Sequence, residues 1–288
     1  MRRSVGRGWI DRAFWLACAL CAACVGVLLA GIAGAILWRG LPVLRPGFLT
    51  AVSSEAGASG GVRDEIVGTL ILITTALLVS APLATGVALV HAVYLRSLPA
   101  RRRLLVALYT ANALPSILFG IAGMVVFSRF FGWGKSWLAG GLLLGLMILP
   151  TLSVALIERL RSLPRKYREA ASALGLTRAQ TVWSVLLPQC AGGLLSGALL
   201  GLARAAGETA PILFAAAVFS GAGLPSGLRD SPVAALPYHI FVLAQDSFDP
   251  SVESHLWGAA CVLVGLVLGL SLLALPARLR AHEEAQNA

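Results

Sequence analysis

The sequence predicts an all-α polytopic membrane protein with six transmembrane helices, and three observations lead to this fold class. Hydrophobic residues make up 58% of the 288 residues, charged residues only 12%, and the mean hydropathy is +0.83. A soluble domain carries roughly 25% charged residues, so this chain has too little polar surface to stay dissolved. Apolar stretches long enough to cross a hydrocarbon core of about 30 Å also recur along the chain. These observations exclude a soluble enzyme.

Six segments reach the length of about 20 residues that a transmembrane helix needs. Helix is the expected conformation because lipid offers no partner to unpaired backbone groups. The first segment could instead be a cleaved signal peptide, but its apolar run exceeds the roughly 7–15 residues of such a peptide, so we expect a retained span. In chain order the predicted spans are approximately Phe14–Trp38, Ile66–Leu95, Leu104–Phe127, Trp137–Ile157, Cys190–Phe219 and Leu256–Leu275.

The basic residues predict the orientation of these spans. With the amino terminus in the cytoplasm, cytoplasmic segments hold sixteen Lys and Arg residues and outer segments hold six, while Arg204 lies inside the fifth span. Because Lys and Arg are enriched in cytoplasmic loops, both termini are predicted to be cytoplasmic. The net charge of +10 does not indicate a nucleic-acid partner, since the basic residues form short runs between apolar stretches instead of one basic face.

Outside the spans, three segments are long, and we expect a single domain over residues 1–288. Arg39–Glu65 and Gly221–His255 are predicted to face outward, and Glu158–Gln189 to face the cytoplasm.

We predict no catalytic residues, no cofactor and no metal site. Cys18, Cys21 and Cys24 are spaced as in some metal sites, but no His or carboxylate lies beside them in the span. The four histidines are scattered along the chain.

A first motif lies in the cytoplasmic segment between the fourth and fifth spans. The run Arg168-Glu169-Ala170-Ala171-Ser172-Ala173-Leu174-Gly175, followed by Leu187-Pro188, resembles the coupling-loop signature of permease subunits of ABC importers. The resemblance implies two short helices, with Glu169, Ala170, Ala171 and Gly175 at the contact to an ATPase subunit. Gly175 can end the first helix in a left-handed conformation. The alternative is an ordinary amphipathic linker helix.

A second motif, Arg204-Ala205-Ala206-Gly207-Glu208-Thr209-Ala210-Pro211, resembles the signature of phosphate-importer permeases. The runs Ile66–Leu70 and Leu114–Gly120 agree with the same branch, and the resemblance to the A-type subunit extends from about Gly61 to Leu275. One departure concerns the position after Pro150, where family members often carry Arg-Thr-Thr and this chain carries Thr151-Leu152-Ser153.

The resemblance implies the fold, partners and location of a phosphate importer. It implies a type-1 ABC importer permease in the inner membrane, pairing with a homologous permease subunit as a heterodimer. Two cytoplasmic ATPase subunits and an extracytoplasmic phosphate-binding protein complete the implied machine, which contacts membrane lipid and no nucleic acid.

Arg204, Glu208 and Thr209 are the predicted substrate-pathway residues. Arg204 and Glu208 are four residues apart, so they are expected on one face of a helix. An arginine at the bilayer centre costs about 2.5–3.5 kcal/mol, whereas such a pair supplies only about 0.2–0.5 kcal/mol. We therefore expect the pair to face a water-filled path or a partner subunit; a structural ion pair between helices is the alternative.

Beside this pair, small residues recur every four positions in the fifth span. Gly193, Gly197 and Gly201, continued by Ala205, form a stripe that lets another helix approach closely. We predict that this stripe is a helix–helix interface, on the edge of a translocation pathway between subunits.

Two other functions remain open at this point. One is an ABC permease for another oxyanion, such as phosphonate or molybdate. The other is a secondary transporter or channel, which inverted repeats or broken helices would favour; neither feature is visible in the sequence.

Overall fold

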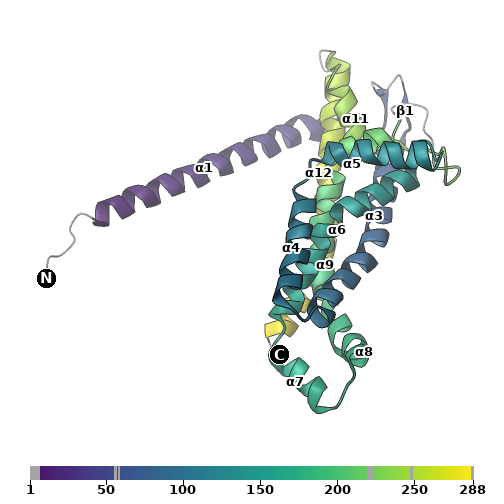
Figure 1. Cartoon of the computed structure of the whole chain (residues 1–288). Coiled ribbons are helices and arrows are strands. Elements are labelled where there is room, and N and C mark those ends of the chain that lie inside the picture. Colours follow the sequence, from purple (N-terminus) through teal and green to yellow (C-terminus); the bar gives the residue numbers. More distant parts are fainter. Residues whose placement is uncertain (1–6, 55–56, 58, 219–223, 247–248, 287–288) are drawn as a thin grey trace.

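A computed structural model describes residues 7–54, 57, 59–218, 224–246 and 249–286 of the chain. The predicted end of the fifth span at Phe219 and the basic residues Arg2 and Arg3 lie outside the described residues. The described chain is almost entirely helical (Figure 1). Five helices are long and apolar enough to cross a membrane, and a bent pair of shorter helices makes a sixth candidate. The all-α membrane fold is therefore confirmed.

The bundle is built around α6 (Trp137–Ser162), which packs against α3 (Arg63–Leu89) and α9 (Leu187–Ala206). Small residues allow these contacts. A Cβ at Gly141 of α6 would lie 2.5 Å from Thr75 on α3, and one at Gly145 would lie 3.0 Å from the Ala76 carbonyl oxygen. Most bulky apolar residues of α6 are buried between its neighbours, among them Leu144, Met147, Ile148, Leu152 and Leu156, so α6 is the core helix of the described chain.

On α9, the small-residue stripe faces α6 of the same chain. A Cβ at Gly193 would lie 2.6 Å from Arg159, one at Gly197 3.1 Å from Ala155, and one at Gly201 2.6 Å from Leu152. The helix that the stripe contacts is thus α6 of the same chain. Its close approach places the end of α9 beside the middle of α6.

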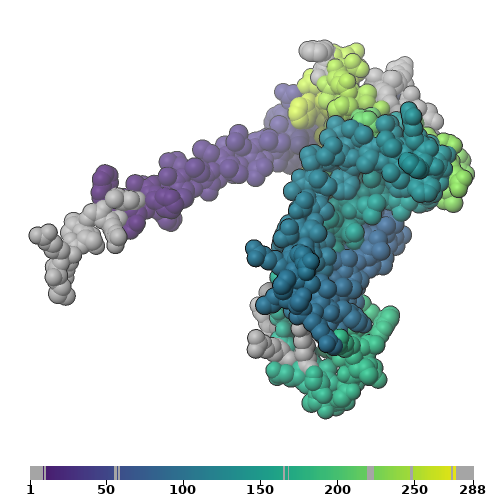
Figure 2. Space-filling view, in the orientation of Figure 1, coloured from purple at the N-terminus to yellow at the C-terminus, as the bar shows by residue number. Residues whose placement is uncertain are grey.

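Helix α1 (Arg7–Gly40) extends away from the bundle as a separate arm (Figures 1 and 2). It meets α12 (Pro250–Gln286) only near its carboxyl end, where Arg39 Nη1 lies 2.7 Å from Glu253 Oε1 and stacks over Trp257. Its apolar side chains are exposed along its length. A helix of this composition needs lipid or protein around it, which agrees with the predicted first span.

Short elements cap the end of the bundle that carries the carboxyl end of α1. They are η1 (Leu41–Val43), α2 (Pro46–Thr50), the two-stranded antiparallel sheet of β1 (Ser53–Ser54) and β2 (Ser59–Gly60), and α11 (Leu236–Leu243).

The contact between α11 and α3 is close and partly polar. The Thr69 hydroxyl accepts a hydrogen bond from the Leu236 amide at 2.9 Å, and a Cβ at Gly68 would lie 1.9 Å from the Ala234 carbonyl oxygen. His239 Nδ1 lies 3.4 Å from Glu65 Oε1, with both side chains buried. Burial, and secondarily the charge of His255, lowers the pKa of His239 to about 4, so its imidazole is neutral at pH 7. Part of the predicted outer segment Gly221–His255 is therefore a helix with one buried side.

At the opposite end, a helical hairpin projects from the bundle (Figure 1). It consists of α7 (Arg165–Ala173) and α8 (Arg178–Thr181), and α8 continues through the π-helical turn η5 (Val182–Leu186) into α9. The predicted segment Glu158–Gln189 is thus shorter than expected, because α6 extends to Ser162 and the helical run of the fifth span begins at Arg178.

Candidate functional site

Two of the six predicted spans are interrupted, and the interruptions define the candidate site. The third predicted span is two helices, α4 (Leu98–Asn112) and α5 (Ser116–Gly123) with the π-helical turn η4 (Met124–Phe130), bent by 85°. Pro115 lies in the break, and it has no N–H with which to continue the helix. The third predicted span is therefore a broken one, and the break at Pro115 was not predicted.

The fifth predicted span also ends early. Helix α9 stops at Ala206, Gly207 to Thr209 are non-helical, and α10 (Ala210–Ala215) is only a short helix. Arg204 therefore lies in the last turn of α9, while Glu208 lies beyond the helix and not on its face. Glycine and the following Pro211 explain the break, since neither favours a continuous helix.

The two interruptions are packed against each other through Gly120. A Cβ on this residue of α5 would lie 2.9 Å from the Ala210 carbonyl oxygen and 2.8 Å from the Phe214 ring. Only a residue without a side chain allows α5 and α10 to meet at this distance. The two runs that carried the resemblance, around Leu114–Gly120 and around Arg204–Pro211, are thereby brought together.

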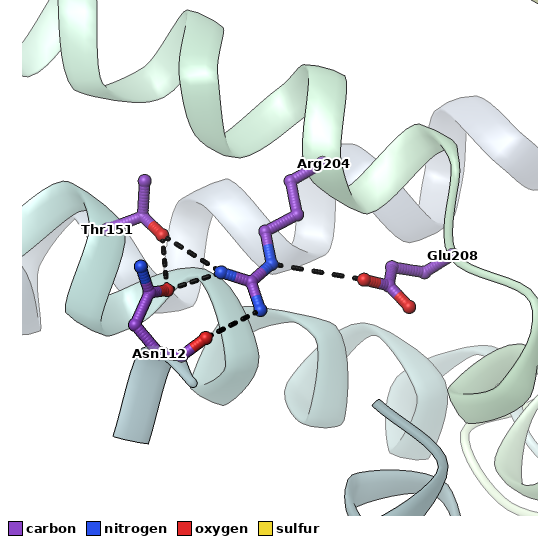
Figure 3. A network of polar contacts seen from close by, with 4 residues as sticks. All are labelled: Asn112, Thr151, Arg204 and Glu208. Carbon is purple, nitrogen blue, oxygen red and sulfur yellow. Dashed lines mark hydrogen bonds and ion pairs between the residues drawn. The ribbon is translucent and has the colours of Figure 1, made fainter. Parts of the chain in front are cut away.

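At this junction the Arg204 guanidinium binds three oxygen atoms from two other helices (Figure 3). Its Nη1 donates to Asn112 Oδ1 and, at 3.5 Å, to Thr151 Oγ1, and its Nη2 donates to the Asn112 carbonyl oxygen at 3.3 Å. The Thr151 hydroxyl donates to Asn112 Oδ1 at 2.8 Å. Asn112 is the last residue of α4, so its carbonyl oxygen has no acceptor role inside that helix and carries part of the negative end of the helix dipole.

Glu208 lies on the other side of the guanidinium (Figure 3). Its Oε1 is 3.9 Å from Arg204 Nε, which is an ion pair but too long for a hydrogen bond. The Arg204 side chain is 26% exposed and that of Glu208 is 16% exposed. The guanidinium is thus fixed on its Asn112 side and only loosely held on its Glu208 side.

These contacts change the energetic argument made from the sequence. Hydrogen bonds to a charged group are worth about 1.5–3 kcal/mol each, so the oxygen atoms of Asn112 and Thr151 are sufficient to offset the about 2.5–3.5 kcal/mol cost of an arginine in the membrane. The expectation of a water-filled path or a partner subunit, with an ion pair between helices as the alternative, therefore left out uncharged oxygen atoms of the same chain. Asn112 and Thr151 were missed, although the Pro115 break and the Pro150-Thr151 pair were visible signals.

The remaining predicted residues lie apart from this network. Thr209 directly precedes α10, and its side chain makes no capping hydrogen bond there. Glu169, Ala170 and Ala171 lie on α7, at the far end of the bundle. The described residues contain no group of three or more His, Cys, Asp and Glu side chains that could hold a metal ion.

The left-handed cap predicted at Gly175 is confirmed. Gly175 has φ +67°, its amide donates to the Ser172 carbonyl oxygen, and the Leu176 amide donates to the Ala171 carbonyl oxygen, both at 3.0 Å. This pair of bonds is a complete Schellman motif. It ends α7 and turns the chain toward α8, whose own start is fixed by a capping box between Thr177 and Gln180.

Comparison with known proteins places this geometry in context. Residues 80–280 match the family described as "Binding-protein-dependent transport system inner membrane component". The chain is similar to phosphate transport system permease protein PstA 2 of Mycobacterium bovis, with 32% identity over 93% of this chain and 88% of the relative.

A probable phosphate transport system permease protein PstA of Methanocaldococcus jannaschii is also similar, with 35% identity over 82% of each chain. Among solved structures, an amino acid ABC transporter crystallised with histidines matches with a TM-score of 0.52 and 14% identity, over 76% of this chain and 92% of the other. At this identity the match supports the fold alone.

Proposed function

The chain belongs to the family of binding-protein-dependent transport system inner membrane components, and we propose that the substrate it carries across the membrane is phosphate. As a member of this family it is a multi-pass inner-membrane permease of an ABC importer, a transporter component and not an enzyme. Broken helices, which the sequence argument reserved for a secondary transporter, are therefore present in an ABC permease. Phosphate as the substrate is supported by the named relatives and by the chemistry around Arg204.

The Arg204 network carries the proposal. A phosphate anion needs a fixed positive charge in a path of low dielectric constant, and guanidinium matches its oxygen atoms with a planar fork of donors. Asn112 and Thr151 hold one side of this fork, while the Nε side faces Glu208 at 3.9 Å and donates no hydrogen bond to the described residues. A phosphate oxygen can approach Nε and displace Glu208, whose carboxylate then competes for Arg204 and promotes release.

We assign the pathway role to Arg204 and Glu208, with Thr209 at the start of α10. Non-helical backbone inside a membrane is tolerated where it is buried in protein or lines a water-filled cavity, and substrate sites of transporters form at such interrupted helices. The breaks at Ala113–Pro115 and Gly207–Thr209 fit this placement. ATP-driven uptake of phosphate by the reconstituted importer tests the proposal.

The assembly implied is a heterodimer with a homologous permease, two cytoplasmic ATPase subunits and an extracytoplasmic phosphate-binding protein. The end of the bundle bearing α7 and α8 is assigned to the cytoplasm, together with both termini, because the basic residues gather on that side. In this orientation Glu169 to Gly175 project toward the ATPase. The exposed side chains of Leu174 and Trp183, 77% and 71% accessible, support a protein contact at the hairpin.

Replacing Gly175 should separate coupling from assembly of the membrane part. A Cβ at this position meets no atom within 4 Å, so a substitution is opposed only by the positive φ. Gly175→Val should lose ATPase copurification and uptake several-fold, because a β-branched residue strongly disfavours this conformation, whereas Gly175→Asn should retain both, since asparagine tolerates it. Equal ATPase recovery with the two variants would contradict the assignment.

A further inference from the structure

A small pocket lies at the α7 end of the bundle, far from Arg204. It has a volume of about 180 Å³ and lies between the π-helical turn η3 (Val90–Tyr94), the start of α4 and the end of α6. His91, Arg101 and Arg161 line it together with the apolar Ile157, Leu160 and Leu163. Arg101 lies in the first turn of α4 and Asn112 is its last residue, and these 11 residues rise about 16 Å at about 1.5 Å per residue. The pocket is thus separate from the Arg204 network.

The polar residues of this pocket are all basic. No Asp or Glu lines it, and neither Arg101 nor Arg161 has an ion-pair partner within the described part of the chain. Arg101 donates one hydrogen bond from Nε to the Leu95 carbonyl oxygen at 2.7 Å. This bond holds the side chain in place and leaves its two terminal nitrogen atoms, Nη1 and Nη2, as further donors. Two guanidinium groups without a carboxylate leave this pocket with an uncompensated positive charge.

His91 fixes the position of Arg161. Arg161 Nη2 lies 3.3 Å from His91 Nε2, and because guanidinium can only donate, the ring nitrogen accepts and the imidazole is neutral. His91 is 2% exposed, so its ring is part of the packed core and holds the exposed Arg161 against the pocket. The buried His91 thereby orients the exposed Arg161. Side chains of binding sites are held in this way, whereas an ordinary surface arginine moves freely.

We propose that this pocket binds a phosphate-type oxyanion. Its volume corresponds to roughly six water molecules at about 30 Å³ each, and it is smaller than the about 300 Å³ at which sites for drug-sized ligands begin, so it has room for a single phosphate group. Two arginines suit phosphate oxygen atoms through charge-assisted hydrogen bonds. The ligand is either the phosphate group of an anionic lipid at the membrane surface or free inorganic phosphate, and both present the same oxygen atoms.

The location gives such a ligand a consequence for transport. Leu163, which lines the pocket, is followed directly by Pro164 and α7, so an anion bound here lies at the base of the projecting hairpin. It would hold the ends of α3, α4 and α6 together at the point where the hairpin departs. This inference does not depend on which substrate the permease carries.

Binding measurements on the complex of permease and ATPase subunits, without the phosphate-binding protein, test the proposal and separate the two sources. All proteins carry Arg204→Gln, which removes the proposed pathway site. One arm measures equilibrium binding of radiolabelled inorganic phosphate in phosphatidylcholine nanodiscs; the other measures retention of phosphatidylglycerol by native mass spectrometry. The pair Arg101→Gln with Arg161→Gln removes the pocket charge. Arg161→Gln alone keeps the hydrogen bond from Arg101 to the Leu95 carbonyl oxygen, and Arg102→Gln with Arg103→Gln removes the same charge from exposed positions of α4.

We expect the pocket pair to weaken binding in one arm at least tenfold, Arg161→Gln alone to weaken it several-fold, and the exposed pair to leave it unchanged. Loss in the phosphate arm identifies free phosphate, and loss in the lipid arm identifies the headgroup. If the pocket pair and the exposed pair behave alike in both arms, the pocket binds no oxyanion and the proposal is overturned.

Discussion

Arg204→Gln is expected to reduce ATP-driven phosphate uptake by about 10- to 100-fold or more while the complex assembles in normal amounts. A charge-assisted hydrogen bond is worth about 1.5–3 kcal/mol, and each 1.4 kcal/mol is a factor of ten. The Thr151 hydroxyl still donates to Asn112 Oδ1, and a glutamine amide is uncharged, so we expect the helix junction to persist. The charge that phosphate needs is gone.

Arg204→Lys discriminates between charge and geometry. Guanidinium is a planar fork that can donate to Asn112, Thr151 and an incoming anion at the same time. An ammonium group is a compact point charge and lacks this geometry. Uptake should therefore be impaired in a complex of normal abundance. Arg102→Gln, an exposed residue of α4, serves as the control and should transport at the parental rate. Loss of assembly before loss of uptake would instead assign Arg204 a purely structural role.

Gly120→Val is expected to cause the largest loss of stability among the predicted variants. The added side chain would overlap the Ala210 carbonyl oxygen and the Phe214 ring, and the backbone atom cannot move aside as a flexible side chain would. Overpacking costs typically about 1–3 kcal/mol and sometimes more. Separation of α5 from α10 should also displace Asn112 from Arg204, so uptake should fall with stability.

The matched control is Gly86→Val on α3. A Cβ at Gly86 meets no atom within 4 Å, so this variant carries the same β-branched residue in a membrane helix without the overlap. Thermal unfolding of both variants in detergent gives the comparison. Equal unfolding midpoints for the two variants would show that the contact between α5 and α10 is not tight.

The sequence predicted the number and order of the spans but not their interruptions. Hydropathy measures the length of an apolar run, and Leu104–Phe127 is apolar on both sides of Pro115. The mean hydropathy of this segment therefore does not reveal the 85° bend. The same holds at Gly207, where an apolar run continues beyond the true end of α9. Local rules succeeded where one residue decides the outcome, as with the left-handed Gly175.

The candidate site was only half visible in the sequence for a related reason. Arg204 and Glu208 stand out because charges inside a span are rare, whereas Asn112 and Thr151 are uncharged and lie 92 and 53 residues away from Arg204 in the chain. Their role depends on the crossing of α4, α6 and α9, which no local pattern encodes. The stripe of Gly193, Gly197 and Gly201 likewise predicted a close helix contact without showing that the partner is α6.

The most direct test of the central claim is uptake by the complete importer, with its binding protein and ATPase subunits, reconstituted in liposomes. Radiolabelled phosphate and molybdate are supplied separately, with and without ATP on the side of the ATPase. We predict ATP-dependent accumulation of phosphate, little accumulation of molybdate, and loss of the phosphate signal with Arg204→Gln. Uptake of molybdate in preference to phosphate, or phosphate uptake at the parental rate by a fully assembled Arg204→Gln complex, would contradict the account.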